Sequence, residues 1–187
     1  MSVVKTIDPF VNELLNPKTR EKSYLKLLDT YQERLYWYIR KIVLTHENAD
    51  DVLQNTFIRV YKNIENFKHN SSLSTWIFRI AHNESLRFLE KHNKYDISSL
   101  DEIQKDYLTV LKEDPYFEGD DIQTKLHQSI AELTFKQRQV FNMKYFDDLS
   151  FKEISDILDI NENTLKSAYY AAVKHIEQKV TSLQLIE

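Results

Sequence analysis

The chain has 187 residues, of which 42% are hydrophobic and 29% are charged, so it can fold around packed cores and is not wholly disordered. The absence of cysteine excludes disulfides, thiolate metal sites and cysteine nucleophiles. One glycine and three prolines supply few of the tight turns that sheets need, and we therefore predict an all-α protein. No apolar run is long enough for a secretion signal or a membrane span, so we expect a cytoplasmic protein.

The net charge of −4 is distributed unevenly along the chain. Residues 1–95 carry +4, residues 96–121 carry −7 and residues 122–187 carry −1. The acidity is therefore concentrated in one short segment, and the overall charge does not exclude binding to nucleic acid. It argues only against strong, indiscriminate binding to polyanions.

Residues 20–93 are predicted to form a first domain of three helices, preceded by an N-terminal extension, residues 1–19. Apolar side chains recur every three or four residues along each helix, which is the spacing of an amphipathic helix packed on a core. The second helix is expected over about 49–66, and the polar turn 69–72, in which either serine can be the N-cap, precedes the third. The apolar stripe on the first helix consists of Tyr24, Leu25, Leu28, Tyr31, Leu35, Ile39 and Ile42.

Helical periodicity fails between the two halves of the chain. Residues 94–121 contain the acidic segment, Pro115 and the only glycine, Gly119, and are predicted to be an acidic linker. Composition alone also allows this segment to be a solvated, flexible tether and nothing more.

Residues 122–187 are predicted to form a second helical domain with clear helix start signals. The segments 134–137 and 150–153 both fit the capping box, in which the N-cap hydroxyl and a side chain three residues later satisfy each other's backbone amides. Asn161 can cap the last helix. The predicted helices are about 122–133, 135–146, 150–158 and 162–179.

The last two predicted helices have the dimensions of a helix-turn-helix, with residues 159–161 as the turn. Side chains on the outward face of the second helix can contact base edges and phosphates, as a major-groove recognition helix requires. On spacing alone, an ordinary helical hairpin with a solvated polar face is the alternative. The outward side chains are Asn163, Thr164, Lys166, Ser167, Tyr170 and Lys174.

Three segments resemble the sigma-70 family of RNA polymerase sigma factors. Residues 149–174, LSFKEISDILDINENTLKSAYYAAVK, are similar to the promoter-reading helix-turn-helix of that family. Residues 48–57, NADDVLQNTF, and 72–83, SLSTWIFRIAHN, are similar to motifs of its other conserved domain. The chain size and the lack of a middle domain between the two motifs resemble the extracytoplasmic-function (ECF) group.

The resemblance implies a division of labour between residues 20–93, which correspond to sigma region 2, and residues 122–187, which correspond to region 4. Such a protein binds core RNA polymerase, directs promoter-specific initiation, helps to melt promoter DNA and carries out no catalysis. The resemblance implies no cofactor and no metal. The implied partners are core polymerase, promoter DNA (double-stranded upstream, single-stranded at minus-ten) and, where one exists, an anti-sigma factor.

In the family, the helix of the first motif binds a coiled coil on the largest polymerase subunit. The corresponding helix here offers acceptors on one side and apolar side chains beside them. A helix N-terminus enriched in acids for electrostatic reasons explains only the first two residues of this set. The residues predicted to bind polymerase are Asp50, Asp51, Gln54, Asn55, Phe57 and Tyr61.

The loop 66–73 and the helix after it correspond to the element that captures flipped bases of the minus-ten region. Extruding a base costs a few kcal/mol, which stacking and hydrogen bonds to the base edge must offset. Trp76 can equally be a core residue, and either serine can be only a helix cap. The predicted pocket residues are Phe67, His69, Asn70 and Ser71, and the predicted strand-binding residues are Trp76, Arg79, Asn83 and Arg87.

The final helix is predicted to read the minus-thirty-five element, with Lys144 as a further phosphate contact. Asp159 stands where the family has a turn glycine, and aspartate tolerates the left-handed conformation better than most residues. Ala168 and Ala171 replace two usual arginines, which weakens phosphate attraction, so direct reading and partner contacts must contribute relatively more. Tyr169 is expected on the packed side of the helix.

Two other classes of function stay open. One is a DNA-binding regulator that does not join polymerase, and residues 48–61 argue against it because a regulator has no need of that motif. The other is an adaptor bundle that binds only protein. The six histidines form no evident ligand cluster and the paired aspartates are adjacent in sequence, so we do not expect an enzyme.

Overall fold

The computed structural model describes residues 9–92, 106–110, 113 and 121–184. The regular secondary structure of these residues consists of helices, without strands, which confirms the all-α class. Most of the predicted linker, 94–121, lies outside them. No helix in the described part is long and apolar enough to cross a membrane. The helices are α1 (Pro9–Leu15), α2 (Arg20–Val43), α3 (His46–Asn63), the 3-10 turn η1 (Ile64–Asn66), α4 (Leu73–Lys91), α6 (Asp121–Ala131), α7 (Phe135–Tyr145), α8 (Phe151–Leu158) and α9 (Glu162–Gln184).

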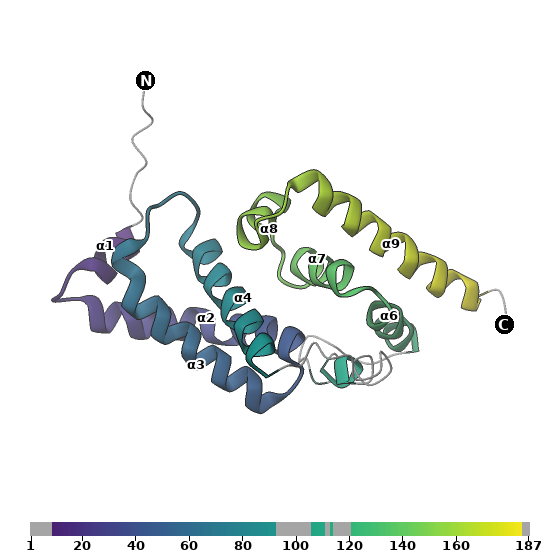
Figure 1. The fold of residues 1–187 in the computed structure, drawn as a ribbon, viewed down its shortest axis with the longest axis horizontal. Helices are drawn as coiled ribbons and strands as arrows, with labels where there is room; N and C mark the ends of the chain where they lie inside the picture. Colours follow the sequence, from purple (N-terminus) through teal and green to yellow (C-terminus); the bar gives the residue numbers. More distant parts are fainter. Residues whose placement is uncertain (1–8, 93–105, 111–112, 114–120, 185–187) are drawn as a thin grey trace, which may run out of the picture.

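Helices α2, α3 and α4 pack against one another and form the first half of the molecule (Figure 1). Their core contains fully buried side chains such as Ile39 and Ile77. The predicted stripe on α2 was wrong at one position, because Leu25 is 61% exposed whereas Leu27 is fully buried. Helix α1 lies in the predicted extension and was not expected. It packs on α2 and buries Val11.

Hydroxyl side chains cap two of these helices. The Ser72 Oγ atom accepts a hydrogen bond from the Thr75 backbone N–H at 3.0 Å, which confirms that a serine of the polar turn begins α4. The Thr45 Oγ1 atom accepts one from the Asn48 N–H at 3.3 Å. Because of this cap, α3 begins at residue 46, three residues before its predicted start.

Helices α6 to α9 form the second half of the chain. Both predicted capping boxes are present, one between Thr134 and Gln137 and the other between Ser150 and Glu153. In each box the side chains satisfy backbone amides that the first turn of a helix otherwise leaves without a partner. These local signals fix where α7 and α8 begin.

Helices α8 and α9 form the predicted helix-turn-helix. Asp159 adopts the left-handed conformation with φ of 55°, as expected of the residue that replaces the turn glycine. The Asn161 Oδ1 atom accepts a hydrogen bond from the Asn163 N–H at 2.9 Å and so caps α9. Ile154 of α8 and Leu165 of α9 are fully buried in the angle between the two helices.

The two halves are packed together through α4 and α8 (Figure 1). One hydrophobic cluster includes Phe78 of α4 and Ile154 of α8, and both side chains are fully buried. Polar contacts cross the same boundary: the Thr75 Oγ1 atom donates to a Glu153 carboxylate oxygen at 3.4 Å, and an Arg34 guanidinium nitrogen donates to a backbone carbonyl of the second half at 3.1 Å.

A histidine lies at this boundary as well. The Tyr38 hydroxyl of α2 and the Gln139 amide nitrogen of α7 lie 3.1 and 3.3 Å from Nδ1 of His82. His82 is only 6% exposed, and burial lowers its pKa to about 4. The contacts therefore suit a neutral imidazole that accepts hydrogen bonds.

Candidate nucleic-acid interface

The recognition-helix candidate, α9, contacts its neighbours along one side only. Leu165, Ala172 and Ile176 point into the core and are less than 8% exposed. The predicted outward stripe lies on the other side, as the helical spacing requires. Its exposed members are Asn163, Thr164, Ser167, Tyr170 and Lys174, while Lys166 is half-buried.

Two of the outward side chains already have partners on α9. The Lys166 ammonium lies 3.7 Å from the Glu162 carboxylate, and the Ser167 hydroxyl donates to the Asn163 carbonyl at 2.9 Å. An exposed ion pair of this spacing contributes only about 0.3–0.5 kcal/mol. Phosphates or base edges can therefore compete for Lys166 at little cost.

Residues from three helices converge beside the start of α9. The Lys144 and Lys166 ammonium groups lie 6.0 and 5.9 Å from the centre of the Phe151 ring, one from α7 and the other from α9. Lys144 and Lys166 thus lie around the same ring, although the whole of α8 separates them in sequence. Phe151 and the two lysines combine positive charge with apolar area.

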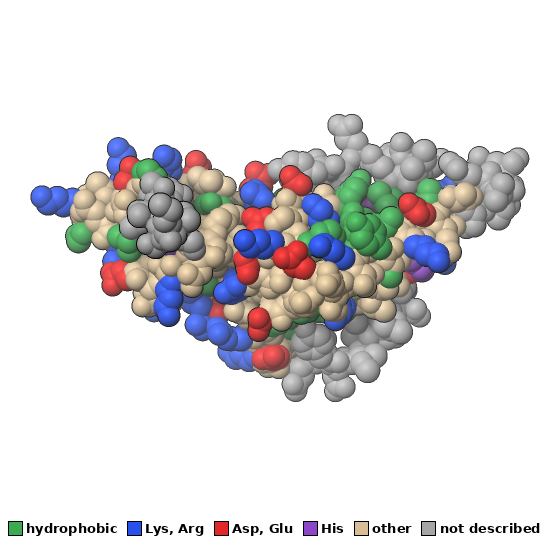
Figure 2. Space-filling view, turned by 90° about the horizontal axis from the view of Figure 1, so that it is seen from above, with side chains coloured by type: hydrophobic (Ala, Val, Ile, Leu, Met, Phe, Trp, Pro, Cys, Tyr) green, Lys and Arg blue, Asp and Glu red, His purple; other side chains and the backbone are tan. Residues whose placement is uncertain are grey.

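An aromatic group continues this surface and was only partly predicted. Tyr169 is half-buried and stacks on Phe141 at 6.0 Å, in agreement with its expected place on the packed side. Tyr145 also stacks on Phe141, with ring centroids 5.2 Å apart, and is 57% exposed, and Tyr170 is 62% exposed. Figure 2 shows hydrophobic side chains gathered over α9, with cations beside them. Sequence reasoning missed Tyr145 because it lies outside the helix-turn-helix.

The acid-and-amide series of α3 is exposed as a group. Asp50, Asp51, Gln54 and Asn55 all lie on the surface. The prediction that Phe57 contacts polymerase is corrected, because this side chain is only 8% exposed and belongs to the core. It follows Val52 and precedes Val60 on the buried side of the helix, so it offers little apolar area to a partner.

Tyr61, the other apolar residue predicted on this surface, is 42% exposed. Its ring meets the Tyr24 ring edge-on at 4.8 Å, and the Arg20 guanidinium lies 4.5 Å from its centre. Arg20 also donates to the Tyr61 carbonyl at 2.7 Å. Tyr61 lies about two turns beyond Gln54 along α3. Tyr24 and Arg20 of α2 partly cover its ring.

The predicted minus-ten pocket is only partly open. Phe67 is 8% exposed. Its ring packs against the rings of Trp76 and His69, with centroid distances of 5.4 and 4.6 Å. Its predicted role as an accessible pocket wall is therefore corrected to that of a support for the other two rings. Asn70 is exposed and Ser71 is half-buried. His69 has φ of 55°, so the loop turns sharply at this residue.

The four predicted residues of α4 follow one helical stripe, since positions 76, 79, 83 and 87 are three or four residues apart, but their contacts differ. Trp76 is half-buried, and Arg79 and Asn83 are exposed. Arg87 is exposed too, but it forms an ion pair with Glu84, which also pairs with Arg59 of α3 at 2.6 Å. At the end of this stripe, the guanidinium of Arg87 is therefore held toward α3. It is also about 16 Å along the helix from Trp76.

No group of three or more potential ligands among His, Asp and Glu is arranged to hold a metal ion in the described residues. None of the predicted sites depends on such a group.

Comparison with known proteins identifies the family. Residues 27–95 match the family model described as Sigma-70 region 2, and residues 123–176 match Sigma-70, region 4. The ECF RNA polymerase sigma factor SigW of Bacillus subtilis (strain 168) is 27% identical over 175 residues, which cover 89% of this chain and 93% of that protein. The ECF RNA polymerase sigma-E factor of Haemophilus influenzae is 26% identical over 171 residues, covering 87% of this chain and 90% of that protein.

Solved structures share the fold. CnrH in complex with the cytosolic domain of CnrY aligns with a TM-score of 0.66 at 14% identity, covering 92% of this chain and 96% of that chain. The sigma factor RpoE in complex with the anti-sigma factor NepR from Bartonella quintana aligns with 0.64 at 18% identity, covering 86% and 98%. With both regions matched in order, the chain belongs to the ECF group of the sigma-70 family and is a sigma factor, which directs promoter-specific initiation of transcription by RNA polymerase.

Proposed function

We propose that the two halves divide the recognition of polymerase and promoter. Residues 20–93 bind core polymerase and the minus-ten element, and residues 122–187 bind the minus-thirty-five element. Residues 94–121 connect them, and residues 1–19 are an extension whose helix α1 supports α2. The protein melts the DNA by holding extruded bases and performs no covalent chemistry, in the cytoplasm where polymerase acts.

The outward stripe of α9 is the observation that carries the proposal for the upstream element. Lys166, Ser167 and Tyr170 lie on the open side of a capped helix-turn-helix, where base edges of a major groove can reach them. Lys144 and Lys174 flank this stripe and contact phosphates. Because phosphate contacts position the protein and base contacts specify the sequence, the two kinds of residue have separable effects.

For the minus-ten element, we propose that Trp76 and His69 stack on extruded bases while Phe67 supports both rings from below. Asn70 and Ser71 hydrogen-bond to base edges. Arg79 and Asn83, which are exposed on α4, contact the strand beside the pocket. This arrangement combines stacking with cations, as single-strand binding requires. The packing of Phe67 against both His69 and Trp76 supports it.

For core polymerase, we propose that the exposed part of α3 is the main binding surface. It comprises Asp50, Asp51, Gln54 and Asn55, and Tyr61 lies at its far end. The proposal is tested with the double variant Asp51→Arg, Gln54→Ala. We expect it to lose affinity for purified core while its helicity is unchanged.

A matched control is available on α2. Asp29 and Gln32 are an exposed acid and amide with the same three-residue spacing, so Asp29→Arg with Gln32→Ala makes the same chemical change elsewhere. The control is expected to bind core normally. If both double variants bind core with equal affinity, the proposal that α3 is the binding surface is refuted.

Promoter-dependent RNA synthesis with purified core separates this function from its rivals. A sigma factor makes core transcribe from a promoter, whereas a regulator binds duplex DNA without enabling core, and an adaptor does neither. We propose in addition that an anti-sigma protein binds this chain, because RpoE of the same fold was solved with one. Co-purification from the native organism, followed by loss of transcription on adding the partner, tests this point.

A further inference from the structure

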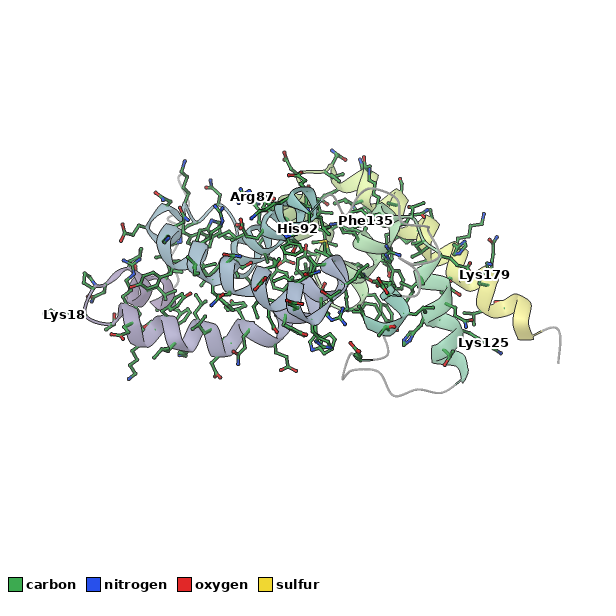
Figure 3. All side chains as sticks on the ribbon, turned by 60° about the horizontal axis from the view of Figure 1, so that its bottom comes forward. Lys18, Arg87, His92, Lys125, Phe135 and Lys179 are labelled. Carbon is green, nitrogen blue, oxygen red and sulfur yellow. The ribbon has the colours of Figure 1, made fainter. Side chains whose placement is uncertain are left out.

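A groove of about 410 Å³ runs between α3 and α4. Its α3 wall includes Asp51, Asn55 and Arg59, and its α4 wall includes Glu84, Arg87 and Lys91. Arg87 and His92 mark the α4 side in Figure 3. The groove continues the polar surface of α3, since Asp51 and Asn55 belong to both. It therefore extends the proposed polymerase-binding surface across to a second helix.

A clamped carboxylate fixes the geometry of this groove. The side chain of Glu84 is only 10% exposed, and it pairs with Arg59 at 2.6 Å and with Arg87. A buried carboxylate is stable only when it is well paired, so Glu84 holds both guanidinium groups in place. The two arginine side chains are themselves 48% and 56% exposed. Each guanidinium has five N–H donors, more than Glu84 can use.

The charges of the groove favour an acidic guest. Two guanidinium groups on one carboxylate leave an excess positive charge, and Lys91 adds another, whereas Asp51 is the remaining carboxylate of the walls. A DNA backbone, which brings a phosphate at every nucleotide, would meet Asp51 as well as Glu84. A single carboxylate side chain beside Arg59 and Arg87 meets only Glu84, whose charge the two guanidinium groups exceed, and it can accept bidentate hydrogen bonds.

We propose that this groove receives an acidic side chain from the polymerase helix that contacts the outer side of α3, and that Arg59 and Arg87 bind it. The proposal rests on the polymerase-binding role of α3 and adds a second, oppositely charged contact to it. Residues 51 and 59 are about 12 Å apart along α3. The partner helix therefore carries a basic residue opposite Asp51 and an acidic residue roughly eight positions away. In this proposal Arg87 contacts polymerase, and not the minus-ten strand as the sequence predicted.

Two variants test the groove by affinity for purified core. Arg87→Ala removes half of the clamp, and Lys91→Glu reverses an exposed charge without removing any of the ion pairs described above. Both are expected to weaken core binding about tenfold or more, with a smaller salt dependence. Lys62→Glu on α3 is the matched charge reversal outside the groove and is expected to change the affinity less than about twofold. Thermal unfolding of each variant shows whether the fold is retained.

Capture of a single-stranded minus-ten oligonucleotide by the polymerase complex gives the second readout. Arg79→Ala is expected to weaken this capture at normal core affinity, and Arg87→Ala to leave it unchanged once core is saturated. The opposite result for Arg87→Ala, normal core affinity with lost capture, would return it to the minus-ten site and overturn the proposal. If Arg87→Ala fails to fold, Lys91→Glu decides the test, and a normal affinity of this variant for core overturns the proposal. If Asp51→Arg with Gln54→Ala weakens core binding and the groove variants do not, only the groove is refuted. If none of them does, the α3 surface itself is wrong.

Discussion

Helices α9 and α4 are both proposed to bind DNA, but the contacts of their outward residues differ. Helix α9 has a free side, on which Asn163, Ser167 and Tyr170 are exposed. The predicted DNA residues of α4 also share one stripe, but their contacts change along it. Trp76 packs on Phe67, Arg79 and Asn83 are exposed, and Arg87 is paired with Glu84 beside α3. Periodicity therefore locates the outward stripe of both helices. Tertiary contacts decide which neighbours each residue of that stripe has, and periodicity does not predict them.

The central position of α4 predicts the largest effect on stability. Phe78 is fully buried in the cluster that spans both halves, and its ring meets Tyr38 edge-on at 5.1 Å. Phe78→Ala should lower the free energy of unfolding by about 3–5 kcal/mol, because it removes apolar area and leaves a cavity. Tyr170→Ala on α9 should change it by less than about 0.5 kcal/mol. Urea unfolding followed by circular dichroism compares them, and similar losses would show that α9 is not free on its outer side.

The buried histidine of α4 predicts a loss of stability in acid. Burial lowers the pKa of His82 from 6.5 to about 4, so the unfolded chain binds a proton that the folded protein does not. The stabilisation is complete above pH 6.5 and is lost as the pH falls toward 4, by on the order of 3 kcal/mol in all.

The substitution His82→Gln isolates this contribution, because it retains an acceptor for Tyr38 and cannot be protonated. Other groups titrate equally in both proteins, so the relevant quantity is the difference in unfolding free energy between wild type and variant. We expect wild type to lose more stability than His82→Gln between pH 7.5 and pH 5. Parallel pH profiles would show that His82 is not desolvated at the boundary.

Local signals made much of the fold predictable. The capping boxes at 134–137 and 150–153 and the turn residue Asp159 each act within a few residues, and all three have the predicted form. Helix α1 was missed because seven residues have little helical preference of their own, and burial of Val11 and Leu14 on α2 stabilises it.

The candidate sites were predictable to different degrees for the same reason. The α9 stripe followed from spacing, whereas the burial of Phe57 and Phe67 depends on helices that lie elsewhere in the sequence. Tyr145 lies beside α9 because its ring stacks on Phe141, and Phe141 also stacks on Tyr169 of α9. The packing of α8 on α4 has no local signature, since it joins segments about 75 residues apart.

That packing leads to a prediction for the free protein. By their positions, the two promoter elements are about 25 base pairs apart, roughly 85 Å along B-DNA. With α8 directly against α4, the two halves are too close to read both elements at once. We expect at least about 100-fold weaker specific duplex binding by the protein alone than with core. Gel-shift titrations check this, and tight specific binding without core would favour the regulator.

The free side of α9 predicts effects on specificity of intermediate size. Lys166→Ala and Tyr170→Ala each remove a proposed base contact, and loss of such a contact typically costs about 1–3 kcal/mol and relaxes preference at one position. Lys174→Ala removes a proposed phosphate contact and is expected to weaken binding to all sequences alike. A randomised upstream library transcribed in vitro by each variant separates the two outcomes. One unchanged ranking for all three variants would mean that α9 does not read bases.

The smallest expected effects separate two adjacent serines at the start of α4. Ser72 is the N-cap, and its hydroxyl also lies 2.7 Å from the Thr75 hydroxyl. Ser72→Ala should therefore cost about 1 kcal/mol of stability. Ser71 makes no cap of α4, so Ser71→Ala should leave stability within about 0.5 kcal/mol and instead weaken capture of a minus-ten oligonucleotide. Denaturant unfolding and oligonucleotide binding by the polymerase complex give both values for each variant. If Ser71→Ala loses neither, the hydroxyl of Ser71 has no part in base capture, and the pocket consists of His69, Asn70 and Trp76 alone.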